Sequence, residues 1–170
     1  MRRGLVLVTA MAVALLTGCG DKTPMTDAEV GTVTRWAAAY KPVAADMVAA
    51  AEALDKDQLA AAQTALDRVP PKLAAAEREV RALQTADLRA TLADYMRITR
   101  RTITAFDAFV AQLRTKPDDR TAVLRKQTEL RDANDELFSA DSKIRDRVFD
   151  HANADQEKAL DPAIPLPIGD

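Results

Sequence analysis

Residues 26–54 have the sequence TDAEVGTVTRWAAAYKPVAADMVAAAEAL, which carries the clearest secondary-structure pattern in the chain. Thr26 is followed three residues later by Glu29, the spacing of a capping box at a helix start. Apolar residues then recur at alternating steps of three and four, which places them on one face of a helix. The pattern predicts one long helix over residues 26–54, bent at Pro42, where proline removes a hydrogen bond. The apolar positions are Val30, Val33, Ala37, Tyr40, Ala44, Met47, Ala51 and Leu54.

The same spacing continues in three further segments, separated by short turn signals. Residues 57–83 contain Pro70 and Pro71, and the tetrapeptide Leu-Ala-Ala-Ala at 59–62 recurs at 73–76. That offset keeps both copies on one helix face, so we favour one proline-kinked helix here over two separate helices. Helices are also expected over residues 86–115 and 118–153. Residues 154–170 are rich in proline and are expected to form an extended C-terminal tail.

Four helices of similar length joined by short turns predict an all-α fold over residues 26–153. Short connections place consecutive helices side by side, so the expected architecture is an antiparallel up-down-up-down four-helix bundle with proline-kinked first and second helices. Glycine is scarce, at 5 of 170 residues, which also favours helix. Six of the seven aromatic side chains lie at or beside the apolar seams and are expected to fill the core. They are Trp36, Tyr40, Tyr95, Phe106, Phe109 and Phe138.

The composition limits the chemistry that the chain can perform. Its 24 basic and 26 acidic residues give no excess of positive charge, and phosphate binding requires a concentrated basic surface, so no nucleic-acid partner is expected. The chain has one histidine, His151, and two serines, Ser139 and Ser142. Ser142 and His151 would lie about 13 Å apart on opposite faces of one helix, too far for a histidine to activate a serine. We therefore expect no enzymatic activity, no metal site and no cofactor.

Met25 and His151 are expected at the same end of the bundle. This pair is loosely similar to the iron ligands of periplasmic haem-b four-helix bundles, which come from the first and last helices. Met25 precedes the helix start in this sequence, which departs from that pattern. We favour a role for His151 at the end of the last helix, where a histidine complements the helix dipole.

Polar residues are expected to gather at mid-height in the bundle, near the two proline kinks. Antiparallel pairing brings Thr99, Thr102 and Asn134 to the level of Pro42 and Pro70. The favoured interpretation is that these side chains bond to carbonyls freed by the prolines and fix the register of the helices. The alternative is that the layer lines a small-ligand cavity.

Arg97, Arg100 and Arg101 form the densest basic cluster of the third predicted helix. Antiparallel pairing sets Arg97 against Glu136 and Arg101 against Asp132. Ion pairs between helices are therefore favoured over an anion or lipid-headgroup site, and exposed pairs contribute only about 0.2 to 1 kcal/mol each.

The N-terminal residues have the pattern of an export signal. Arg2 and Arg3 are followed by an apolar segment, Leu5–Leu16, that is too short to span a bilayer, which takes about 20 residues. The segment ends in Leu-Thr-Gly-Cys at residues 16–19. This stretch resembles the signal and lipobox of bacterial lipoproteins. Beyond it, the composition is similar to that of small helical lipoproteins of high-GC Gram-positive bacteria.

The resemblance implies cleavage after residue 18 and lipidation of Cys19, with residues 19–25 as an acylated tether. It places the protein outside the cytoplasm, attached to the cell membrane through an N-terminal lipid anchor. We expect the helical domain to act there as an interaction or scaffold module with a protein partner in the cell envelope. The alternative is a small-ligand binding or sensing bundle that uses the polar layer.

We expect Cys19 to be acylated and to be the mature N-terminus. Mass spectrometry of the protein from membranes should find a diacylglyceryl-modified N-terminal cysteine, and Cys19→Ala should shift the protein from the detergent phase to the aqueous phase. An unmodified Cys19 in a protein that is released without detergent would contradict this expectation.

Overall fold

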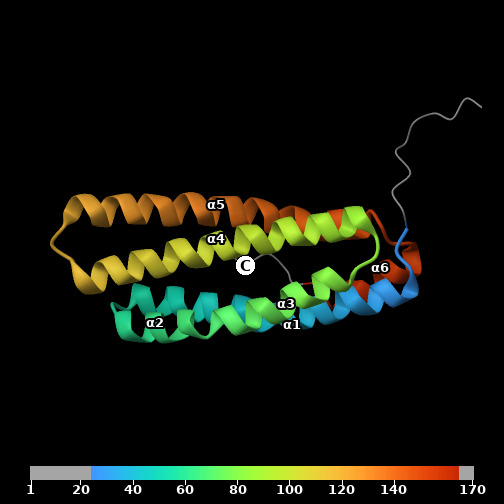
Figure 1. Cartoon of the computed structure of the whole chain (residues 1–170), viewed down its shortest axis with the longest axis horizontal. Helices are drawn as coiled ribbons and strands as arrows, with labels where there is room; N and C mark the ends of the chain where they lie inside the picture. The colour runs from blue at the N-terminus through green and yellow to red at the C-terminus, as the bar shows by residue number, and fades with distance from the viewer. Residues whose placement is uncertain (1–23, 165–170) are drawn as a thin grey trace, which may run out of the picture.

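The computed structural model describes residues 24–164, and in this range all regular secondary structure is α-helical, as the sequence predicts (Figure 1). The signal segment, Cys19 and residues 165–170 of the expected tail lie outside the described residues. The helices are α1 (Asp27–Asp55), α2 (Leu59–Asp67), α3 (Val69–Ala82), α4 (Ala86–Thr115), α5 (Arg120–Phe149) and α6 (Ala154–Leu160).

Helix α1 begins at the predicted capping box. The Glu29 amide donates to Thr26 Oγ1 over 3.3 Å, and the Thr26 amide donates to Glu29 Oε2 over 3.0 Å. The helix continues through Pro42 and ends at a turn in which Asp57 has a φ of 55°. Its buried face differs from the predicted seam in the second half, where Val43 and Ala50 are buried in place of Ala44 and Ala51. Met47 is buried at its predicted position, so the seam is right there and shifted by one residue on either side of it.

The segment expected as one kinked helix is divided into α2 and α3 at Arg68. Pro70 and Pro71 lack amide hydrogens, so two consecutive helical hydrogen bonds cannot form across this point. Asp46 of α1 supports the junction, because its buried carboxylate accepts from Arg68 Nε over 3.1 Å and from Lys72 Nζ. Burial raises the pKa of Asp46, but the bonds from Lys72 and Arg68 outweigh it and leave that pKa below its ordinary value.

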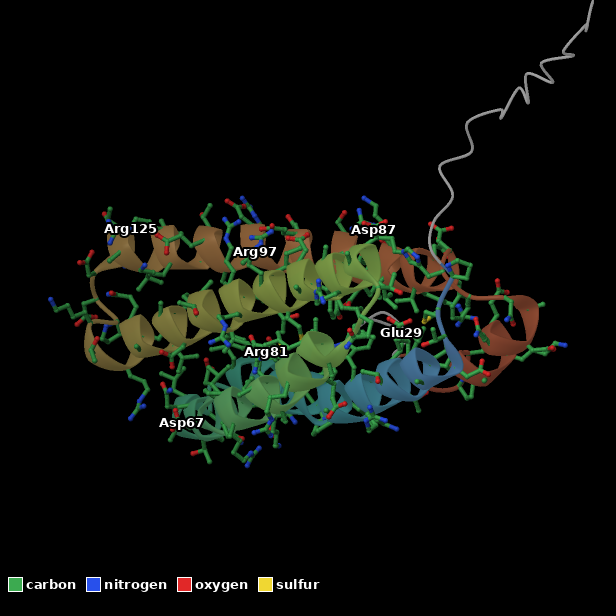
Figure 2. All side chains as sticks on the ribbon, turned by 45° about the vertical axis from the view of Figure 1, so that its right-hand side comes forward. Glu29, Asp67, Arg81, Asp87, Arg97 and Arg125 are labelled. Carbon is green, nitrogen blue, oxygen red and sulfur yellow. The ribbon has the colours of Figure 1, made fainter. Side chains whose placement is uncertain are left out.

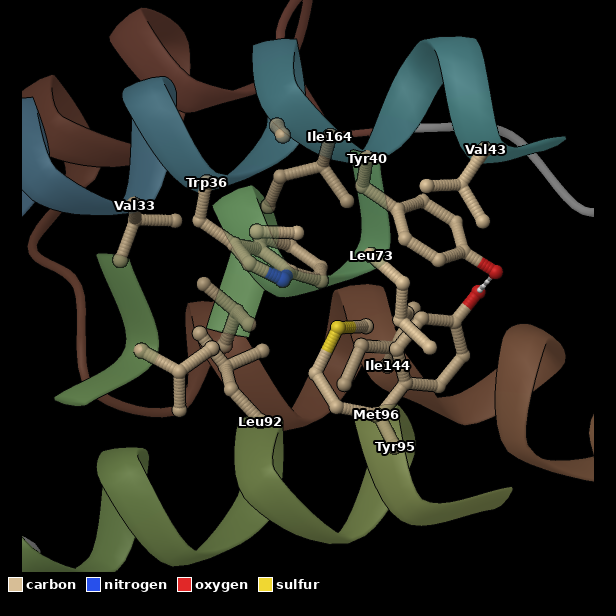
Figure 3. Close-up of a cluster of buried hydrophobic side chains, with 14 of the residues drawn as sticks. Val33, Trp36, Tyr40, Val43, Leu73, Leu92, Tyr95, Met96, Ile144 and Ile164 are labelled. Atoms are coloured by element: carbon tan, nitrogen blue, oxygen red, sulfur yellow. Dashed lines mark hydrogen bonds between the residues drawn. The ribbon is translucent and has the colours of Figure 1, made fainter. Parts of the chain in front are cut away.

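Two groups of helices face each other across the core. Helix α1 packs on α2 and α3, and α4 packs on α5 along most of its length, while α1 and α5 have little direct packing. Trp36 and Tyr40 of α1 are fully buried against Tyr95 of α4, with ring centroids 5.2 to 6.0 Å apart (Figure 3). The Trp36 Nε1 donor has no hydrogen-bond acceptor among the described residues.

Residues 154–160 form helix α6, so the prediction of an extended chain is wrong for this segment. Asn153 and Gln156 make a second capping box, a signal that the prolines of the tail obscured. Gln156 Nε2 donates to the Met25 carbonyl over 3.1 Å, and the Met25 amide donates to the His151 carbonyl over 2.7 Å. With Leu160 and Ile164 buried, α6 and the residues after it close the end of the core.

Glu29 joins the start of α1 to the turn between α3 and α4 (Figure 2). Its side chain is 4% exposed, and Oε1 accepts from the amides of Gln84 and Thr85 over 3.0 and 2.6 Å. Oε2 accepts from the Thr85 hydroxyl over 3.1 Å. Burial raises the pKa of Glu29, but the bonds from Thr26 and Thr85 outweigh it and lower that pKa to about 2.

Glu29→Gln should destabilise the fold by about 3 kcal/mol at neutral pH, because a pKa lowered from 4.5 to about 2 corresponds to that difference. The folded pKa lies below the ordinary value, so the stabilisation is present above about pH 4.5 and is lost as the pH falls towards 2. Urea unfolding at several pH values measures both effects.

Glu52→Gln is the matched control, because Glu52 lies on the same helix and is exposed. It should leave the stability near that of the wild type. If the stability of Glu29→Gln still fell between about pH 4.5 and 2 as it does in the wild type, the proposed role of Glu29 would be contradicted.

Candidate functional site

A groove lies between α1 and α5, with a volume of about 460 Å³. Its floor is apolar and consists of the buried side chains of Met47, Phe106 and Leu137. We call it the α1–α5 groove. Its lining residues are Met47, Val48, Ala51, Glu52 and Asp55 of α1, Phe106 of α4, and Asn134, Asp135, Leu137, Phe138 and Asp141 of α5.

The groove exposes two large apolar side chains. Phe138 is 57% exposed and Val48 is 41% exposed, and Leu124 is the remaining large exposed apolar residue in the part of the chain described here. Phe138 was expected in the core, and the structure corrects this. Leu137 takes the core position, and one residue further along a helix turns the side chain by about 100°, which points Phe138 to the edge.

Apart from Val48 and Phe138, the walls of the groove carry short or polar side chains, which leave it open. Ala51 on α1 is too small to reach across, and Asn134 on α5 is exposed. Ala50 of α1 and Ala62 of α2 belong to one cluster of buried residues, and such small side chains let these two helices pack closely. No large side chain therefore closes the seam between α1 and α5.

Every charged residue that lines the groove is acidic. Glu52 and Asp55 come from α1, and Asp135 and Asp141 come from α5. Glu52 has one basic neighbour outside the lining, Lys56, at 3.9 Å. Like charges on both walls of a cleft add to a negative potential, which favours a cationic ligand.

Asp141 connects the groove to a buried network of hydroxyl groups. Tyr95 donates its hydroxyl hydrogen bond to Asp141 Oδ1, and the Tyr95 and Tyr40 hydroxyl oxygens lie 3.0 Å apart (Figure 3). The Tyr40 hydroxyl is also 3.4 Å from Thr99 Oγ1. The network runs from the groove into the centre of the core across three helices.

Both tyrosines of this network stay protonated at neutral pH. Burial raises the pKa of Tyr40 to about 12, and burial together with the nearby Tyr40 and Asp141 raises the pKa of Tyr95 further. Groups with such pKa values do not exchange protons readily near pH 7. The arrangement is therefore suited to holding the helices and presenting Asp141 rather than to acid–base chemistry.

The structure separates the residues of the predicted polar layer. Thr99 and Thr102 are fully buried, and Thr99 donates to the Tyr95 carbonyl over 3.0 Å. Thr102 donates to the Ala133 carbonyl of α5 over 3.0 Å, which links α4 to α5. Asn134 is exposed and lines the groove, which includes neither threonine. The three side chains do not surround one cavity.

The arginine cluster makes ion pairs between helices, as the sequence predicts, although one partner differs. Arg97 Nη2 is 3.8 Å from Glu136, as expected. Arg101 also pairs with Glu136, over 2.5 Å, and not with Asp132 as expected. Arg100 reaches back to Glu77 of α3 over 2.5 Å.

The other candidate residues lie away from the groove. Ser142 donates to the Ser139 carbonyl over 3.1 Å on the exposed face of α5, and His151 is buried in the turn before α6. Among residues 24–164, no group of three or more metal-binding side chains comes together. No helix in the same range has the length and apolar character needed to cross a membrane.

Comparison of the chain with protein-family models, with curated proteins and with solved structures found no match.

Tyr95→Phe should destabilise the fold by about 1 to 3 kcal/mol, because it leaves a buried carboxylate oxygen without the tyrosine hydroxyl. Tyr40→Phe is the matched control and should cost only about 0.5 to 1.5 kcal/mol, since its hydroxyl contacts neutral groups. Urea unfolding of both variants gives the comparison. An equal or larger loss in Tyr40→Phe would show that the contact with Asp141 is not the stabilising one.

Proposed function

We propose that this protein is a lipid-anchored, extracytoplasmic interaction or scaffold module of the cell envelope, without enzymatic activity, that binds a protein partner through the α1–α5 groove. The observation that carries the proposal is the exposure of Phe138 and Val48 over an apolar floor. Scattered exposed apolar residues are common, whereas a contiguous apolar patch marks an interaction site, and Phe138 and Val48 line the same groove as its apolar floor.

The rigidity of the groove supports this function. Phe106 and Leu137 belong to a helix pair that is tied by the Thr102–Ala133 hydrogen bond, and Asp141 is held by Tyr95. A surface that is already ordered loses little conformational entropy on binding, so more of the contact energy appears as affinity.

The proposed anchor rests on residues 16–19, Leu-Thr-Gly-Cys. Acyl chains on Cys19 would hold the protein on the outer face of the membrane, because two or more chains anchor stably whereas one does not. Met25 is packed into the domain, so residues 20–24 would form the tether and extend over at most about 18 Å at roughly 3.5 Å per residue, which would keep the helical domain close to the membrane.

The proposal also includes the finer architecture. We assign α1, the pair α2 and α3, α4 and α5 as the four rods of an up-down-up-down bundle, with α6 as an added closing helix. The short turns between these rods and the kink at Pro70 support the assignment.

The second candidate function is small-ligand binding. The volume of the groove, about 460 Å³, falls within the range of about 300 to 1,000 Å³ that small-molecule sites occupy. A compound that raises the melting temperature of the wild type but not of Asn134→Leu would favour this candidate over a protein partner.

Site-specific photo-crosslinking in intact cells tests the interaction module. With p-benzoylphenylalanine in place of Phe138, we expect a discrete protein adduct in the membrane fraction. The same probe in place of Leu124 is the control, because Leu124 is exposed on α5 but does not line the groove. No protein adduct from position 138, or the same adducts from both positions, would reject the proposed function.

A further inference from the structure

The α1–α5 groove has a chemistry that specifies what occupies it. We infer that the groove binds a basic amphipathic helix of the partner protein, with apolar side chains on the floor and lysine or arginine side chains towards both walls. This inference rests on the proposed interaction function and names the kind of segment that the groove recognises.

The dimensions of the groove fit about two turns of a helix. Its α1 wall runs from Met47 to Asp55 and its α5 wall from Asn134 to Asp141. At 1.5 Å per residue these walls are about 12 and 10 Å long, and a helical turn rises 5.4 Å. A helix lying between them would present apolar residues at positions i, i+3 or i+4, and i+7 to the floor.

The distribution of charge identifies the occupant as basic. Glu52 and Asp55 stand on one wall and Asp135 on the other, so a helix with cations on both flanks pairs with both walls. A second copy of this chain is disfavoured, because two acidic grooves placed face to face repel each other.

The acidic character belongs to this seam and not to the whole surface. On the α3–α4 seam, a groove of about 320 Å³ is lined by Arg81, Arg97 and Arg100, by the buried Met96 and by one acidic residue, Glu77. Figure 2 labels Arg81 and Arg97 on these two helices. The two seams therefore differ in the sign of their charge, and only the α1–α5 seam also exposes large apolar side chains.

Binding of a model peptide tests the inference. The probe is a fluorescent 14-residue peptide of leucine and lysine, with leucine at helical spacing on one face. The full-length chain is used in nanodiscs of zwitterionic lipid, which do not attract the peptide by charge. We expect measurable binding by fluorescence anisotropy, and at least about tenfold weaker binding of the peptide with glutamate in place of lysine.

Matched variants locate the binding. Asp135→Lys should weaken binding of the lysine peptide by about fivefold or more, whereas Asp132→Lys, also exposed on α5 but outside the groove, should change it less than about twofold. Phe138→Ala should weaken binding by about tenfold, and Leu124→Ala should not. Circular dichroism checks that each variant is folded.

Equal binding of the two peptides, equal effects of Asp135→Lys and Asp132→Lys, or no binding at all would overturn the inference. Displacement of the peptide by an equimolar hydrophobic cation, tetrabutylammonium, would also overturn it and indicate a small-ligand site. If the peptide results contradict the inference but position 138 still gives a cross-linked adduct, the proposed interaction function is retained, and the partner binds through another kind of segment. If the adduct is absent as well, both proposals fail.

Discussion

The packing of Trp36 and Tyr40 against Tyr95 sets the distance between the two groups of helices, and the rest of the structure depends on that distance. The three rings are fully buried where α1 approaches α4, and large rigid side chains hold helices apart there. Further along α1 the buried residues are small, as at Ala50 and Ala53, and they draw α1 towards α2. The seam between α1 and α5 is then left open, because the residues that follow Val48 on this wall, Ala51, Glu52 and Asp55, are short or polar and do not fill it. The groove is a consequence of this change in side-chain size along one helix.

Sequence periodicity was sufficient to locate α1, α4 and α5, but it missed the break between α2 and α3, the helix α6 and the spaces between the helices. The capping box at Thr26 and Glu29 located the start of α1, since it is a local signal with a local cause. After Tyr40 the predicted seam was right at Met47 but wrong at Ala44 and Ala51, where Val43 and Ala50 are buried instead. Which side of α1 is covered depends on where α2 and α3 pack on it, and a repeat within one helix does not contain that information. Phe138 was placed in the core because hydrophobicity was taken as burial, whereas Leu137 beside it already fills that position. The groove could not be predicted, since it depends on how α1 and α5 are rotated and separated.

Polar groups inside this protein divide into those that hold the fold and those that face the groove. Glu29, Thr99 and Thr102 are buried with their hydrogen bonds satisfied, which rigidifies the helix packing around them. Asp141 belongs to both sets, because it accepts a hydrogen bond from the buried Tyr95 and also lines the groove. A change at Asp141 would therefore alter the binding surface and the core together. Asp135 lines the same groove and is exposed, so a substitution at Asp135 changes the binding surface without changing the core.

The hydrogen bonds around Met25 determine how the domain would respond to tension. The Met25 amide is bonded to the His151 carbonyl, and the Met25 carbonyl to Gln156, so both ends of the described chain meet at one point. A pulling force applied ahead of residue 24 is shared by α1, the end of α5 and α6. Peeling α1 away from its N-terminal end first requires both bonds to break, together with extraction of the buried Met25 side chain. A domain held to a membrane by that end would thus resist mechanical unfolding at the point where the load enters.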